Sequence, residues 1–116
     1  MCLYKIKKEF KANDNIMYGY KVYEKCKRAY KDRYMGNIRR IGLHYKSGSG
    51  CLSTRTGRWY ENGFHVYSSL KEAKRIANWT GGVVCEVLIW DIRVKGSEMI
   101  SNVIVAKNLR IMREIS

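Results

Sequence analysis

The stretch RWYENGFHVYSSLKEA, residues 58–73, holds a turn, a short strand and a helix start in immediate succession. Residues 61–63 (Glu-Asn-Gly) predict the turn, because Asn-Gly readily supplies the positive φ that tight turns need. Residues 64–67 (Phe-His-Val-Tyr) alternate between two faces, as the side chains of a strand do. The stretch therefore predicts that the chain turns, extends and then enters a helix.

The helix start is marked by Ser69 and by Glu72 three residues later, which together form a capping box. A helix is expected over about 69–79, and the Gly81-Gly82 pair ends it. Upstream, the basic segment Glu24–Arg33 is compatible with either a second short helix of weak amphipathicity or a loop.

Strands account for most of the remaining pattern. The longest apolar run, Val83–Val94, has two mostly apolar faces and predicts a central strand covered on both sides. Leu3–Ile6 and Ile16–Tyr23 predict two strands, which we expect to pair as a hairpin. The fold class that follows is α+β, with five to seven short strands in a mostly antiparallel twisted sheet.

Length and charge define the chain as one domain with two unlike halves. At 116 residues it is expected to form a single domain, residues 1–116. Its formal net charge is +13, and residues 1–58 hold fifteen Lys/Arg against four Asp/Glu. Residues 59–116 hold eight against six. This asymmetry predicts an acidic partner: nucleic acid, an acidic protein surface or, less in keeping with the pattern, anionic lipid.

Several classes of protein are disfavoured by the sequence. No apolar run approaches the roughly 20 residues that span a bilayer, and the N-terminus has no signal-peptide core, so we expect a cytoplasmic protein without a membrane partner. The four cysteines are isolated and include no C-x-x-C pair, so we expect neither a metal nor another cofactor.

Binding to an acidic partner is the chemistry that the basic half favours. Lysine and arginine hold phosphates, and aromatic rings stack on bases. Neither a helix-turn-helix signature nor an RNP box nor a zinc finger is present, and each tyrosine also suits a packed strand. The candidate basic residues are Lys25, Lys27, Arg28, Lys31, Arg33, Arg39, Arg40, Lys46, Arg55 and Arg58. The stacking candidates are Tyr30, Tyr34, Tyr45 and Trp59.

Catalysis has weaker candidates. His65 and Tyr67 share one face of a predicted strand, and Glu86 lies in an apolar setting that could perturb a carboxylate. No Ser/His/Asp or Cys/His arrangement is recognisable, and His65 is equally a strand histidine satisfied by its neighbours. We therefore expect a binding protein rather than an enzyme.

Two segments carry a resemblance. Gly63-Phe64-His65-Val66-Tyr67 with the following helix, and the ending Val103–Ile115 with its Arg-Glu-Ile, resemble blocks of small phage and prophage proteins. The resemblance implies a phage origin and residence in the host cytoplasm. By analogy it suggests an anti-CRISPR-like inhibitor of host defence that binds DNA, RNA or a ribonucleoprotein effector.

Two alternatives remain open beside this expectation. The first is a small nucleotide-handling enzyme or ligand sponge with a pocket near His65, Tyr67 and Glu86, faintly similar in strand–helix–strand order to ADP-ribosyltransferases. The second is a protein–protein module for an acidic target.

Overall fold

The computed structural model of the chain describes residues 3–33 and 36–115. Strands account for 59% of these residues and helix for 10%. The expected α+β class with five to seven strands is therefore wrong: the described chain is mostly β, with ten strands and one helix. In chain order the elements are β1 (Lys5–Glu9), β2 (Ile16–Cys26), β3 (Ala29–Asp32), β4 (Ile38–Arg39), β5 (His44–Lys46), β6 (Cys51–Ser53), β7 (Trp59–Glu61), β8 (Phe64–Tyr67), α1 (Leu70–Thr80), β9 (Val83–Glu98) and β10 (Ser101–Glu114).

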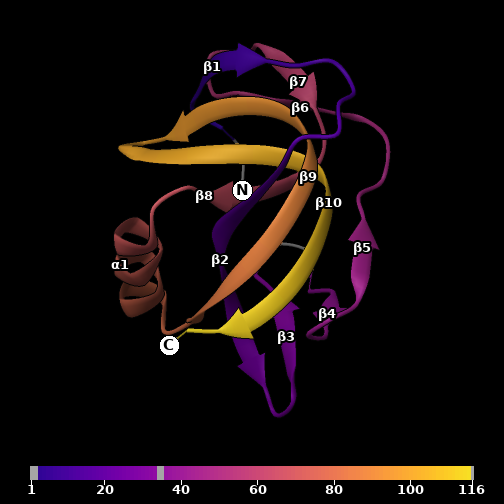
Figure 1. The fold of residues 1–116 in the computed structure, drawn as a ribbon. Coiled ribbons are helices and arrows are strands. Elements are labelled where there is room, and N and C mark those ends of the chain that lie inside the picture. Colours follow the sequence, from indigo (N-terminus) through magenta and orange to yellow (C-terminus); the bar gives the residue numbers. More distant parts are fainter. Residues whose placement is uncertain (1–2, 34–35, 116) are drawn as a thin grey trace.

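The centre of the fold is the long antiparallel hairpin of β9 and β10 (Figure 1). The first half of β9 pairs with β2 and its second half with β1. On the other side of the hairpin, β8 pairs with the first half of β10 and β5 with the second half. The predicted central strand is confirmed. The predicted hairpin between the first two strands is wrong, because β1 and β2 both pair with β9 instead.

A bend near the middle of β9 allows the hairpin to curl (Figure 1). Asp91 has a positive φ of 58°, and the register with β10 shifts between Val105 and Ala106. The Asp91 carboxylate holds the bend, because it accepts two hydrogen bonds from Arg93, at 2.8 and 3.1 Å, and one from the Asn13 amide at 3.1 Å. Bulges of this kind increase the twist of a strand.

The curled sheet closes on itself through β8 and β2. β9 pairs with β10, β10 with β8, β8 with β2 at Tyr67 and Tyr20, and β2 again with β9. Gly19 makes the closure possible, because a Cβ placed there would lie 2.3 Å from Val66 Cγ1. The result is a small barrel. β3 and β4 continue the sheet beyond β2, and β5 pairs with β10.

Helix α1 agrees closely with its prediction. The Ser69 side chain accepts a hydrogen bond from the Glu72 amide at 3.4 Å, and Gly81 ends the helix with φ of 76°. Ala73 and Ala77 are buried against a core cluster that includes Val84 of β9. The helix therefore covers one face of the barrel (Figure 1).

The segment Glu24–Arg33 is not a helix, so the expected second short helix is wrong. Its first half ends β2 and its second half forms β3, with Lys27 at φ of 53° in the turn between them. Pairing across the hairpin buries Tyr30, which is 3% exposed. The cross-strand contacts of Tyr30 outweigh the weak helical pattern of the segment.

Gly63 is needed for space and not for a left-handed turn. It is not among the glycines with positive φ. A Cβ at Gly63 would lie 2.6 Å from the Ala106 carbonyl oxygen, so only glycine lets β8 approach β10 this closely. The turn predicted at 61–63 is a corner between β7 and β8. The Lys107 ammonium stabilises this corner by donating a hydrogen bond to the Asn62 carbonyl oxygen at 2.9 Å.

Candidate ligand-binding site

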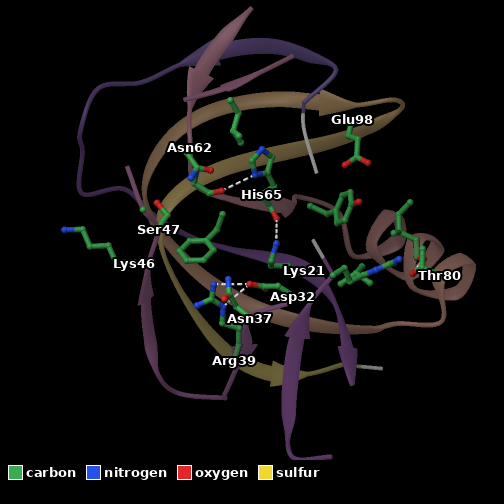
Figure 2. Close-up of a pocket in the computed structure, with 18 of the residues that line it drawn as sticks. Lys21, Asp32, Asn37, Arg39, Lys46, Ser47, Asn62, His65, Thr80 and Glu98 are labelled. Carbon is green, nitrogen blue, oxygen red and sulfur yellow. Dashed lines mark hydrogen bonds and ion pairs between the residues drawn. The ribbon is translucent and has the colours of Figure 1, made fainter. Parts of the chain in front are cut away.

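A cavity of about 930 Å³ lies between the barrel wall, the β3–β4 hairpin and α1 (Figure 2). Its volume is typical of sites that hold small organic ligands. Lys46, Ser47 and Asn62 lie at one end, and Glu98 and Thr80 at the other (Figure 2). The lining residues are Lys21, Val22, Asp32, Arg33, Asn37, Arg39, Lys46, Ser47, Gly48, Leu52, Asn62, Gly63, Phe64, His65, Tyr67, Ile76, Trp79, Thr80 and Glu98.

Lys21 of β2 occupies the middle of the cavity (Figure 2). Its Nζ donates a hydrogen bond to the His65 carbonyl oxygen at 3.0 Å, across the junction of β2 and β8. Burial lowers the pKa of Lys21, and the nearby Asp32 carboxylate partly offsets this effect. An ammonium has three N–H donors, and within the described residues Lys21 forms this one hydrogen bond. The remaining donors are available to an anionic ligand.

Asp32 and Arg39 form a rigid ion pair beside Lys21. Arg39 Nη2 lies 2.9 Å and its Nε 3.1 Å from Asp32 Oδ2. The guanidinium also lies over the Tyr45 ring, 4.6 Å from its centroid, and 5.5 Å from the centroid of Phe64. The ion pair and the two ring contacts hold the guanidinium at the cavity wall.

Three buried polar atoms on the cavity-lining residues have no hydrogen-bond partner within the described chain. They are Asp32 Oδ1, Ser47 Oγ and Glu98 Oε2. Burying a polar atom without a partner costs free energy, so such atoms are rare in native proteins. Three of the five buried atoms of this kind in the described residues thus belong to side chains that line the cavity.

Glu98 and Tyr67 form the end of the cavity next to α1. Burial raises the pKa of the Glu98 carboxyl, and a hydrogen bond from the Tyr67 hydroxyl offsets a smaller part of this rise. Burial likewise raises the pKa of Tyr67 to about 12, so its hydroxyl stays protonated at neutral pH. Tyr67 is thus a hydrogen-bond donor on this wall.

His65 is a neutral, fully hydrogen-bonded histidine. Its Nδ1 lies 3.1 Å from the Gly63 carbonyl oxygen, which requires the proton on Nδ1, and its Nε2 lies 2.9 Å from the Tyr60 hydroxyl. That hydroxyl also accepts from the Leu3 amide at 2.9 Å. Burial lowers the pKa of His65 to about 3. The ring therefore orients β8 and has no free nitrogen for acid–base catalysis near neutral pH.

The structure brings some of the predicted residues together and separates others. Arg33, Arg39, Lys46, His65 and Tyr67 all line the cavity. Glu86 is not among the lining residues, and Arg113 pairs with it at 3.3 Å. The basic residues that do not line the cavity are Lys25, Lys27, Arg28, Lys31, Arg40, Arg55 and Arg58.

Two of these basic residues are engaged elsewhere: Lys25 pairs with Glu114 at 2.6 Å and Arg58 with Glu9 at 2.9 Å.

The stacking candidates divide in the same way. Tyr30 is buried, and the hydroxyl of the half-buried Tyr45 accepts from the Arg40 amide at 2.8 Å. Trp59 is exposed but does not line the cavity, and Tyr34 lies outside the described residues.

Three residues that line the cavity were not predicted from the sequence: Lys21, Trp79 and Glu98. Along β2, Lys21 lies on the opposite face from Tyr20 and Val22. This alternation could have indicated that the face with Lys21 is neither packed in the core nor fully exposed to solvent.

Two other kinds of feature are absent from the part of the chain that the structure describes. In residues 3–33 and 36–115, no three His, Cys, Asp or Glu side chains gather closely enough to hold a metal ion. Over the same residues, no helix has the length and apolar character needed to cross a bilayer. Comparisons with protein-family models, curated proteins and solved structures find no match to this chain.

Proposed function

We propose that this protein binds a nucleotide in the cavity and leaves it chemically unchanged. The observation that carries the proposal is the Lys21 ammonium, held inside the cavity by one carbonyl oxygen. The same Nζ lies 5.8 Å from the centroid of the Tyr23 ring, and a phosphate oxygen would accept from the N–H groups that the carbonyl leaves over. Charge-assisted hydrogen bonds to phosphate are short and strong. Lys46 lines the same cavity and adds positive charge, whereas the charge of Arg39 is balanced by Asp32.

The other half of the ligand is indicated by the rings of the cavity. Phe64, Tyr67 and Trp79 line it together with the cationic groups. Aromatic side chains offer flat faces on which a base stacks, and of these three the Trp79 ring is the exposed one. A ligand that carries both phosphate and a planar base satisfies both sets of residues, and the volume of about 930 Å³ accommodates one.

Binding without catalysis is favoured by the state of His65. Both ring nitrogens have partners within the protein, and burial lowers its pKa to about 3. Glu86, the other carboxylate considered from the sequence, is paired with Arg113 away from the cavity. The protein thus fits a nucleotide sponge better than a nucleotide-converting enzyme.

Calorimetric titration of mono-, di- and triphosphate nucleosides into wild type, Lys21→Met and Lys71→Met tests the proposal. Lys71 is exposed on α1, so its variant matches the charge change outside the cavity. Loss of a hydrogen bond to a charged group costs about 1.5–3 kcal/mol, so Lys21→Met should weaken binding about 10- to 150-fold. Lys71→Met should bind like wild type. Absence of binding to wild type, or equal binding by the Lys21 variant, would overturn the proposal.

A second candidate function is binding of a nucleic-acid strand on the outer surface, including that of a host ribonucleoprotein. Lys27 and Arg28 favour it, because they lie exposed at the tip of the β2–β3 hairpin of a chain with net charge +13. Strand affinity should fall steeply between about 50 and 200 mM salt. The double variant Lys27→Glu/Arg28→Glu should lose strand binding and keep mononucleotide binding. Salt-independent affinity would exclude this candidate.

A further inference from the structure

Resting on the proposed function, we propose that the base of the bound nucleotide is guanine and that the Glu98 carboxylate recognises it. Glu98 is the last residue of β9, where the hairpin turns toward β10. Its carboxylate lies at the end of the cavity opposite Lys46 and Ser47 (Figure 2). The end of the cavity with Glu98 would therefore contact the nucleobase, and the opposite end, with Lys46, is the more positively charged one.

The hydrogen-bonding capacity of Glu98 selects the base. Its Oε2 is buried and has no hydrogen-bond partner within the described residues, and Tyr67 is a hydrogen-bond donor to the same carboxylate. An ionised carboxylate only accepts hydrogen bonds, and its two oxygens can accept from two parallel N–H groups. Guanine presents two such donors side by side, N1–H and the 2-amino group. Adenine presents a donor beside the acceptor N1, which would face a carboxylate oxygen and repel it.

The neighbouring side chains fit a planar ring at this end. Helix α1 bounds this side of the cavity, where Thr80 and the preceding Trp79 both line it (Figure 2). The Trp79 side chain is 81% exposed, so its ring has a free face on which a base can stack. Tyr67 lies on the same wall and holds its proton at neutral pH, as shown above.

The phosphate then extends toward the centre of the cavity. Lys21 lies between the Glu98 end and the Lys46 end (Figure 2). Its unused N–H donors meet the phosphate when the base contacts Glu98.

Titration with GMP, IMP and AMP tests the inference, because the three share phosphate and ribose and differ in the base edge. One correct base contact gives about 10- to 100-fold discrimination, so GMP should bind that much more tightly than AMP. IMP lacks the 2-amino group and should fall between them. Glu98→Gln should remove the preference for GMP, whereas Glu24→Gln, an exposed matched control on β2, should keep it.

The outcomes separate the inference from the proposed function. Equal affinity of wild type for GMP and AMP would overturn guanine recognition while leaving nucleotide binding intact. Retention of the GMP preference by Glu98→Gln would overturn the role of Glu98. Failure of all three nucleotides to bind wild type would overturn the proposed function itself.

Discussion

Replacing Gly19 with alanine tests whether the close approach of β2 and β8 closes the barrel. The added Cβ would lie 2.3 Å from Val66 Cγ1 and 3.3 Å from the Tyr67 carbonyl oxygen. Two carbon atoms normally sit 3.5–4.0 Å apart, so the strands must separate or Val66 must leave its place in the core. Overpacking of this kind costs about 1–3 kcal/mol of the free energy of unfolding.

The sign of the effect is informative, because Gly→Ala at a compatible position stabilises by about 0.4–1 kcal/mol. Gly48→Ala is the matched control: its φ is not in the left-handed region, and a Cβ there would meet no atom within 4 Å. For a chain of this length, 1 kcal/mol corresponds to about 4 °C in Tm. Thermal unfolding followed by circular dichroism should show Gly19→Ala about 4–12 °C below wild type. Gly48→Ala should equal or exceed wild type.

The Gly19 variant also tests the link between closure and site. Lys21 lies two residues along β2, and its hydrogen bond to the His65 carbonyl crosses the same junction. Separation of β2 from β8 should therefore weaken nucleotide binding as well as stability. If Gly19→Ala unfolds at the same temperature as Gly48→Ala, the barrel is not closed at this point and the reasoning fails.

Three further predictions concern single residues. Burial lowers the pKa of His65 to about 3 from 6.5, so unfolding takes up a proton and the free energy of unfolding should fall as the pH drops from about 6.5 toward 3. Chemical denaturation at several pH values should show a flatter dependence for His65→Gln; an unchanged slope would refute a neutral buried imidazole. Burial raises the pKa of Cys85 to about 12, so alkylation of the native protein at pH 8, read by mass spectrometry, should label the exposed Cys26 and Cys51 and spare Cys85 until unfolding. Rapid labelling of native Cys85 would contradict its burial. Ser69→Ala removes the N-cap of α1 and should lower the free energy of unfolding by about 1 kcal/mol, measured by urea denaturation; no change would show that the cap contributes nothing.

The sequence predicted an element correctly where the residues that define this element are close together in the chain. The capping box at Ser69 and the glycine pair at 81–82 defined α1, because both helix ends depend on neighbouring backbone groups. The run Val83–Val94 identified a central strand, because burial on both faces leaves little room for polar residues.

Long-range pairing accounts for what the sequence did not predict. The segment Glu24–Arg33 has a weak helical pattern, and the contacts that make it a hairpin include Tyr30 bonding Glu114, 84 residues away. Gly63 resembled a turn glycine, yet its role depends on the Ala106 carbonyl in β10. Neither partner is identifiable from the local sequence.

The site was predicted in part for the same reason. Arg33, Arg39 and Lys46 were chosen for their charge, and all three line the cavity. Lys21 was missed because its burial arises only when β8 is placed across β2. Glu98 lies beyond the predicted strand Val83–Val94, and its role depends on the distant α1 and β8 that complete the cavity wall.

Nucleotide binding in the cavity is tested most directly by titrating GMP into ¹⁵N-labelled protein and following the backbone amide and indole N–H signals by NMR. The account predicts shifts concentrated at Lys21, at His65 and at the Trp79 indole, all of which line the cavity, with the Lys27 and Arg28 amides unchanged. Spectra that do not change with GMP, or shifts confined to the β2–β3 tip, would contradict it.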